Sequence, residues 1–134
     1  MNPGSIVLDA SAAIEWLLQT QIGVKIEARV FSKAGTLHAP HLLDIEVAQV
    51  LRRYASTGTI TGSRGREALE DLVDLPISRY PHEWLLERVW ELRDNLSAYD
   101  AAYVALAEAL DVPLVTCDRQ TASAPGHHAR VEVI

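Results

Sequence analysis

Four acidic residues stand at points where the sequence predicts that a strand ends or a helix begins. Asp9 follows the apolar run Ile-Val-Leu, and Asp118 follows Leu-Val-Thr-Cys. Glu46 and Asp100 each lie near the start of a stretch with helical spacing. In open parallel sheets, ligands bind beyond the carboxyl ends of the strands, where loops enter helices. We therefore expect the four carboxylates to converge on one rim of a sheet.

Such a cluster has a definite chemistry. Carboxylates held within a few ångströms of each other repel and raise one another's pKa unless cations intervene. Oxygen-rich sites of this kind suit Mg²⁺ or Mn²⁺, which keep positions open for water and phosphate. The reaction that follows is metal-assisted cleavage of a phosphodiester, with a metal-bound water as the nucleophile.

Each acid taken alone has a simpler structural explanation. Ser97 and Asp100 fit the S-x-x-D pattern of a helix start, and Glu46 would be favourable against a helix dipole. Asp9 and Asp118 can cap the segments that follow them, and Asp44, two residues before Glu46, is expected to be an N-cap. Helix N-caps can equally be Ser, Thr or Asn. Four acidic residues at four such positions therefore favour a functional site over capping alone.

Alternating strands and helices must position these acids. We expect strands or extended segments at 5–9, 36–40, 75–80, 112–118 and 129–134, and helices at 12–20, 23–34, 42–56, 63–74, 83–94 and 97–110. This alternation is typical of βαβ units and a parallel sheet. The 134 residues amount to one domain, so the prediction is a single α/β sandwich over residues 1–134.

Composition narrows the function classes. The formal net charge of −6 argues against a protein that simply coats DNA, but an enzyme that meets phosphate through cations stays open. No apolar run approaches the roughly 20 residues that span a bilayer, and the first residues show no signal peptide. The one cysteine, Cys117, rules out an intrachain disulfide. We expect a cytoplasmic protein with no membrane partner.

Four stretches carry a family resemblance that extends over essentially the whole chain. They read VLDASAAIEWLL, HAPHLLDIEVAQVLRRY, SAYDAAYVALAEAL and PLVTCDRQTA. Their order and spacing resemble the PIN-domain family and, within it, the VapC toxins of bacterial toxin–antitoxin modules. The pair YDAAYVALA and LVTCD is the most distinctive part. One departure is the small, polar segment RQTASAPGHH after Asp118, where the family often has a bulkier apolar residue.

The resemblance implies a PIN-like three-layer α/β/α sandwich around a short-stranded parallel sheet. It also implies an endoribonuclease that depends on Mg²⁺ or Mn²⁺, cuts structured RNA such as tRNA or rRNA, and is inhibited by a VapB-type antitoxin. A homodimer and a larger toxin–antitoxin complex belong to the same expectation. By position, the catalytic and metal-binding residues are Asp9, Glu46, Asp100 and Asp118, supported by the hydroxyls of Ser11 and Thr116.

Other residues are weaker candidates. Arg52, Arg53, Arg64 and Arg66 surround a glycine-containing turn and are candidates for contact with RNA or antitoxin, although a solvated helix face is the commoner explanation. His38 and His41, and the pair His127 and His128, lack the HExxH spacing of a zinc site and are interpreted as loop residues. The three tryptophans are assigned to buried helix faces or an interface before base stacking.

Two other functions compete with the nuclease. A phosphotransfer domain with an aspartyl nucleophile after the first strand generally needs a second acid as D-x-D or a late lysine, whereas this chain has Asp-Ala-Ser and no late lysine. A catalytically silent PIN-fold module that binds RNA or protein would be favoured if one acid were missing, and all four are present. The nuclease is therefore the prediction.

Overall fold

Five short strands form one parallel sheet in the computed structural model, which describes residues 2–134. They are β1 (Ile6–Leu8), β2 (Leu37–Pro40), β3 (Ile77–Tyr80), β4 (Leu114–Thr116) and β5 (Val131–Val133). The strand order is β3-β2-β1-β4-β5, and Val7 pairs with His38 of β2 on one side and Leu114 of β4 on the other. The chain therefore changes direction beside β1, which places the topological switch point between β1 and β4.

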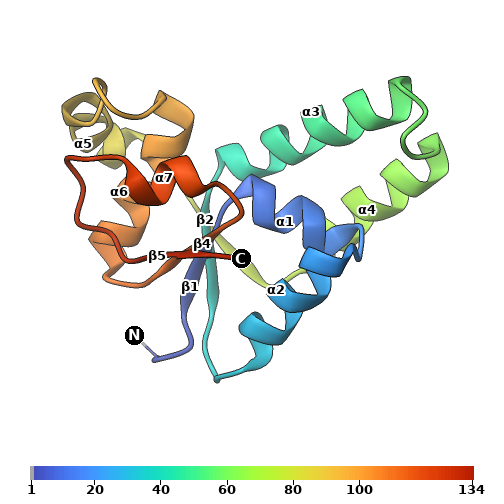
Figure 1. Cartoon of the computed structure of the whole chain (residues 1–134), viewed down its shortest axis with the longest axis horizontal. Coiled ribbons are helices and arrows are strands. Elements are labelled where there is room, and N and C mark those ends of the chain that lie inside the picture. The colour runs from blue at the N-terminus through green and yellow to red at the C-terminus, as the bar shows by residue number, and fades with distance from the viewer. Residues whose placement is uncertain (1) are drawn as a thin grey trace.

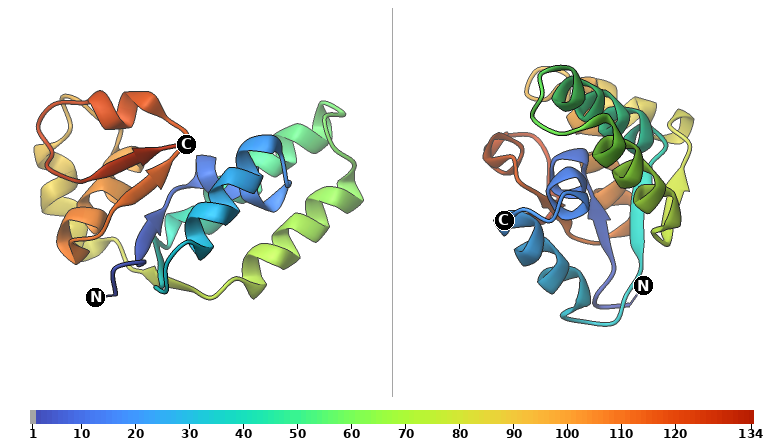
Figure 2. Two further views of the ribbon diagram at one scale, coloured as in Figure 1. Left: turned by 60° about the horizontal axis from the view of Figure 1, so that its bottom comes forward. Right: turned by 90° about the vertical axis from the view of Figure 1, so that its right-hand side faces the viewer.

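Helices cover both faces of the sheet. They are α1 (Ala10–Leu17), α2 (Gln21–Phe31), α3 (Leu42–Ser56), α4 (Gly62–Asp74), the 3₁₀ turn η1 (Glu83–Leu85), α5 (Leu86–Glu91), α6 (Ala98–Leu110) and α7 (Arg119–Ser123). Figures 1 and 2 show α1 and α2 on one side and α5 and α6 on the other, with α3 and α4 extending as an antiparallel arm. The predicted three-layer α/β/α sandwich is confirmed.

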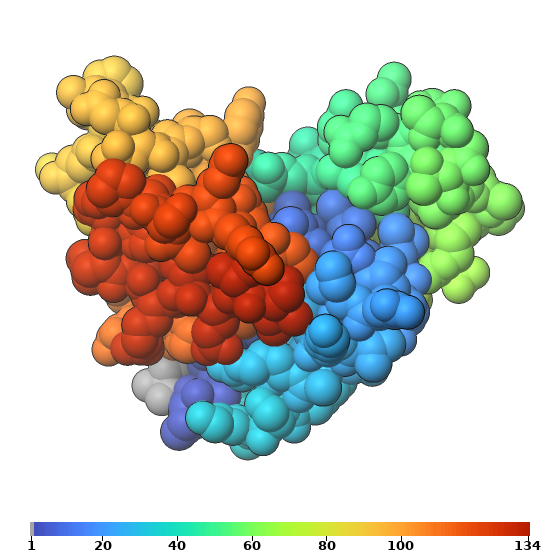
Figure 3. Space-filling view, in the orientation of Figure 1, coloured from blue at the N-terminus to red at the C-terminus, as the bar shows by residue number. Residues whose placement is uncertain are grey.

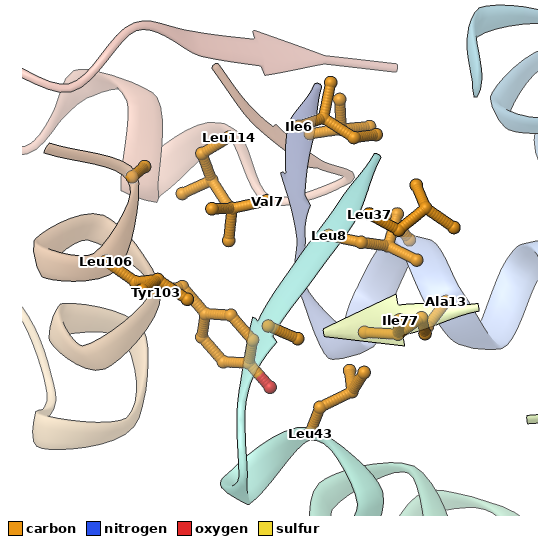
Figure 4. Close-up of a cluster of buried hydrophobic side chains, with 14 of the residues drawn as sticks. Ile6, Val7, Leu8, Ala13, Leu37, Leu43, Ile77, Tyr103, Leu106 and Leu114 are labelled. Carbon is orange, nitrogen blue, oxygen red and sulfur yellow. The ribbon is translucent and has the colours of Figure 1, made fainter. Parts of the chain in front are cut away.

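The core lies on both faces of the central strands. Ile6, Val7 and Leu8 are fully buried, as are Leu114 and Val115 of β4. Strands covered by helices on both sides need continuous apolar runs, which is how these segments read. Figure 4 shows Tyr103 and Leu106 of α6 against one face of this core. The buried strands give the residues at their carboxyl ends a rigid base.

The structure corrects the predicted elements in the second half of the chain. The expected helix at 83–94 is broken into η1 and the short α5, and the segment after Asp118 forms α7, which the sequence did not predict. Trp16 is buried as expected, but Trp84 is 48% and Trp90 67% exposed, so assigning them to buried faces was wrong. Trp90 is instead covered by the guanidinium of Arg93, whose carbon lies 4.6 Å from the ring centre.

The start of α3 also differs from its prediction. Asp44 is not an N-cap: it lies inside the first turn, and its carboxylate accepts a hydrogen bond from Arg79 Nε of β3 at 2.8 Å. The backbone N–H of Leu42 donates instead to His82 Nε2 at 3.0 Å, so a distant imidazole completes this helix end. This contact ties α3, which carries Glu46, to the segment before η1.

His38 is a buried strand residue, not a loop residue. Its Nε2 lies 2.6 Å from Thr36 Oγ1 and its Nδ1 lies 2.7 Å from Tyr80 Oη. Both ring nitrogens therefore have partners, as a buried polar group requires. Among the described residues, no helix is both long and apolar enough to cross a membrane.

Candidate active site

Asp9 is the most firmly held of the predicted site residues. It leaves the carboxyl end of β1 and caps α1, with Oδ1 accepting hydrogen bonds from the Ala12 backbone N–H at 3.0 Å and from Ser11 Oγ at 2.7 Å. Thr116 of β4 donates its hydroxyl proton to Oδ2. Ser11 Oγ in turn accepts from the backbone N–H of Cys117. The two predicted hydroxyls therefore join the switch-point strands through the Asp9 carboxylate.

The other acids reach the same region from different elements. Glu46 lies in the second turn of α3, beyond the first-turn positions where the helix dipole is strongest, and its Oε1 accepts a hydrogen bond from Tyr103 Oη at 2.6 Å. Asp100 lies in the first turn of α6, whose N-cap is Ser97 as predicted. Both carboxylates are half-buried.

Asp118 is placed differently. It caps α7, where its Oδ1 accepts a hydrogen bond from the Gln120 backbone N–H at 2.8 Å and its Oδ2 accepts one from Thr121 Oγ1 at 3.3 Å. Its charge still acts on Asp100. The carboxylate is thus near the cluster but is directed toward the start of its own helix.

The acids are close enough for their charges to act on one another. Burial raises the pKa of Asp9, the charge of Asp100 raises it further, and the hydrogen bonds from Thr116, Ala12 and Ser11 oppose the rise. Burial likewise raises the pKa of Glu46, with added repulsion from Asp100 and Asp9. The pKa of Asp100 is raised by burial and by Asp118. Folding therefore brings together carboxylates that destabilise each other's charged forms.

This donor set suits a hard cation. The donors are carboxylate and hydroxyl oxygens, the ligands that Mg²⁺ and Mn²⁺ prefer. Burial is the main cause of the three raised pKa values and repulsion adds to it, and a bound cation would offset both by stabilising the charged carboxylates. Over residues 2–134, no three His, Cys, Asp or Glu side chains already stand in positions that could hold an ion. The acids are gathered at one place but are not closed into a coordination shell.

Comparison with known families identifies the fold and its relatives. The family model described as PIN domain matches residues 6–126, which include all four acids. The chain belongs to the PIN-domain family. This chain is 50% identical over 113 residues to the VapC ribonuclease Mb0985 of Mycobacterium bovis, and the match covers 84% of this chain and 85% of that one. It therefore belongs to the VapC group, as the sequence resemblance indicated.

Two further comparisons cover nearly the whole chain. Ribonuclease VapC1 of Mycobacterium tuberculosis is 43% identical over 129 residues, 96% of each chain. The crystal structure of VapBC2 from Rickettsia felis bound to a DNA fragment from their promoter superposes with a TM-score of 0.71 at 12% identity, covering 96% of this chain and 98% of that one. The second likeness concerns the fold alone.

A groove opens beside the acids of this PIN domain. Figure 3 shows the hollow between the α3–α4 arm and the part of the chain that carries α5 to α7, with α1 at its floor. Its walls are mainly apolar and come from α1, α3, the start of α6 and the end of β4. The residues lining the groove are Ala10, Ser11, Ile14, Glu15, Leu42, Ile45, Glu46, Gln49, Val50, Arg53, Tyr54, Tyr99 and Cys117.

The four predicted arginines have different surroundings. Arg53 lines the groove, and Arg52 and Arg66 are exposed on the α3–α4 arm. Arg64 donates from Nη2 to the backbone oxygen of Leu17 at 2.6 Å, and its Nη1 lies 3.3 Å from Glu67 Oε1. Arg64 thus holds α4 against the end of α1, whereas the other three side chains are available to a partner.

Two features of the site could not be assigned from the sequence. Cys117 lines the groove, but burial raises the pKa of its thiol to about 11, so it is a weak nucleophile at neutral pH. Tyr103 lies within an apolar helical segment, where the sequence pattern predicts a core residue. The only signal was a hydroxyl-bearing residue three positions after Asp100, on the same face of α6.

Proposed function

We propose that this PIN domain, as one domain over residues 1–134, is a metal-dependent endoribonuclease toxin that hydrolyses phosphodiester bonds in structured RNA, such as tRNA or rRNA, in the cytoplasm. The observation that carries the proposal is the gathering of Asp9, Glu46 and Asp100 at the switch point, where burial and mutual repulsion raise their pKa values. The ribonuclease names of the relatives support it.

Asp9, Glu46 and Asp100 would hold a Mg²⁺ or Mn²⁺ ion, with Asp118 completing the set. When bound, the ion supplies positive charge that polarises the phosphate and lowers the pKa of water. The hydrogen bonds within the protein support this assignment. Oδ1 of Asp9 already accepts two hydrogen bonds and Oδ2 accepts one, so Oδ2 keeps a lone pair for a cation.

The remaining residues of the site hold this carboxylate and receive the substrate. The hydroxyls of Ser11 and Thr116 fix the orientation of Asp9, which is 7% exposed, from two sides. Arg52, Arg53 and Arg66 supply positive charge for RNA phosphates on a chain whose net charge is −6. Phosphate contacts of this kind position a substrate without reading its sequence.

A VapB-type antitoxin is the proposed partner. The groove is apolar along much of its length, and Ile45 on its wall is 73% exposed, which suits the apolar face of a peptide segment. A basic side chain of that segment would meet Glu46, which also lines the groove. Homodimerisation and a larger toxin–antitoxin complex belong to the same proposal. Ile45→Asp should abolish co-purification with the antitoxin while leaving the fold intact by circular dichroism.

The alternative function is a catalytically silent PIN-fold module that binds RNA or protein. The acid cluster argues against it, since a scaffold gains nothing from buried carboxylates that repel each other. Calorimetry with Mn²⁺ separates the two functions. A silent module takes up no metal at this site.

The deciding experiment is cleavage of a pool of total tRNA and rRNA by the purified chain with Mg²⁺ or Mn²⁺. Discrete products should disappear with EDTA and with Asp100→Asn. Asp94→Asn is the matched control, because Asp94 is an exposed acid outside the cluster, and it should cut as the parent chain does. Equal cleavage by Asp100→Asn and Asp94→Asn would refute the assignment.

A further inference from the structure

Tyr103 is a polar residue in the most buried part of α6. Only 2% of it is exposed, and its neighbours Ala101, Val104 and Leu106 are apolar and buried. Figure 4 shows the ring extending from α6 along the sheet, past β2, with its hydroxyl oxygen at the end nearest the start of α3. A buried phenol needs a partner for its hydroxyl, so the choice of partner is informative.

That partner is a site acid on another helix. Tyr103 Oη donates to Glu46 Oε1 at 2.6 Å, across 57 positions of sequence. Tyr103 is also three residues after Asp100, so one face of α6 brings both a carboxylate and a hydroxyl to the cluster. The phenol therefore connects the helix that carries Asp100 with the helix that carries Glu46.

We infer that Tyr103 is a positioning residue that sets which oxygen of Glu46 meets the cation. This inference rests on the proposed function. Oε1 already gives one lone pair to the phenol, whereas Oε2 accepts no hydrogen bond from the described residues, so Oε2 is the oxygen with more capacity to bind a cation. Without the phenol, the Glu46 side chain is free to turn into the groove that it also lines. Replacing a residue that orients a metal ligand typically costs roughly 10- to 100-fold in metal affinity or activity.

A purely structural role would look different. Tyr80 provides the comparison, since its hydroxyl is also engaged by one side chain, His38 Nδ1 at 2.7 Å, which is not an acid. Tyr103→Phe and Tyr80→Phe each remove one phenol hydroxyl and keep the ring. If Tyr103 only supports packing, the two variants should have the same effects.

The test is Mn²⁺ calorimetry on the full chain and the two variants, with melting temperatures measured alongside. Both variants should melt below the parent chain. Tyr103→Phe should bind Mn²⁺ about 10-fold more weakly, whereas Tyr80→Phe should bind it as the parent does. In RNA cleavage, Tyr103→Phe should lower kcat with little change in KM. Parent-like Mn²⁺ affinity in a folded Tyr103→Phe would overturn the inference.

Glu46→Gln separates this inference from the proposed function. If Glu46 is a ligand, Glu46→Gln weakens Mn²⁺ binding, and adding Tyr103→Phe to it should cause no further loss, because the two residues act through one contact. A further 10-fold loss in the double variant would overturn the inference and leave the function standing. Unchanged Mn²⁺ binding in Glu46→Gln alone would overturn Glu46 as a ligand, and so the proposed site itself.

Discussion

Thr116 Oγ1 donates a hydrogen bond to Asp9 Oδ2, which joins the end of β4 to the end of β1 across 107 positions of sequence. The same Oγ1 accepts a hydrogen bond from the backbone N–H of Asp118 at 2.9 Å. One buried hydroxyl therefore orients the central acid and the turn that leads to the fourth acid. Its position at the switch point explains why a polar side chain occupies a fully buried strand end.

Replacing this hydroxyl should affect both metal binding and stability. We expect Thr116→Val to weaken Mn²⁺ binding by roughly 10-fold, because Asp9 loses an orienting donor. The variant should also lose about 1–2 kcal/mol of unfolding free energy, because the half-buried N–H of Asp118 and the buried carboxylate of Asp9 each lose a partner. Calorimetry and urea unfolding measure the two effects. Thr116→Ser keeps the hydroxyl and should retain most of the affinity; parent-like binding by Thr116→Val would contradict the prediction.

Removing one charge from the acid cluster should stabilise the metal-free protein. Because folding raises the pKa of Asp100 above 3.8, the folded state loses stability relative to the unfolded chain as pH rises through that raised value. At pH 7, Asp100→Asn should therefore raise the melting temperature in EDTA by roughly 2–5 °C.

The same variant should respond less to metal. Adding Mn²⁺ should raise the melting temperature of the parent chain by more than that of Asp100→Asn, because the cation then neutralises a smaller repulsion. Differential scanning calorimetry with and without Mn²⁺ checks both points. A lower melting temperature for Asp100→Asn in EDTA would contradict the prediction, because it would show that burial and repulsion of the Asp100 charge do not destabilise the metal-free fold.

His38 should make stability depend on pH in the mildly acidic range. Burial lowers the pKa of His38 below 6.5, so the unfolded chain takes up a proton first as pH falls. The contribution of neutral His38 to the free energy of unfolding is fully present above pH 6.5. It is lost as the pH falls from 6.5 toward the lowered pKa of the folded state, with a slope of at most about 1.4 kcal/mol per pH unit. Urea unfolding at pH 7.5 and 5.5 should therefore show a smaller difference for His38→Gln than for the parent. His41→Gln, at an exposed position, is the control.

Arg88 should be important for stability but not for the metal site. Its guanidinium donates two hydrogen bonds to Glu108, whose side chain is buried, and one to the Gly126 backbone oxygen. Arg88→Met leaves a buried carboxylate without its main partner and should cost roughly 2–3 kcal/mol by urea unfolding. Adding Glu108→Leu should recover much of that loss. Mn²⁺ affinity should not change in either variant; a 10-fold loss would place Arg88 in the metal site.

Periodicity predicted the parts of the fold that bury a regular stripe or run. The helix expected at 42–56 is α3 with the same bounds, and α6 begins after the Ser97 cap that the S-x-x-D pattern indicated. The strands could be recognised because a short apolar run between two helical segments is typical of a strand buried on both faces of a parallel sheet. The approach of Asp9, Glu46 and Asp100 then follows from a parallel sheet whose neighbouring helices begin at the carboxyl edge of the strands.

The remaining features depend on contacts between residues far apart in sequence. Asp44 looked like a cap, but Arg79 on β3 holds its carboxylate. The segment after Asp118 was not predicted as a helix, yet Asp118 itself caps it and the side chain of Thr121 is buried, which suffices for the short α7. Trp90 lies on α5, which has only six residues. In so short a helix the spacing of apolar residues does not show which face is buried. Tyr103 could not be recognised because its partner is on a different helix.

The strand order also means that the acid site cannot be complete until β4 has been made and has docked beside β1. Asp9 is translated well before β4, which lies directly beside β1 in the sheet. Glu46 is likewise translated before Tyr103, which donates a hydrogen bond to it, and Asp100 before Asp118, whose charge acts on it. For the proposed nuclease, we therefore expect RNA cleavage only from a chain in which β4 has docked beside β1.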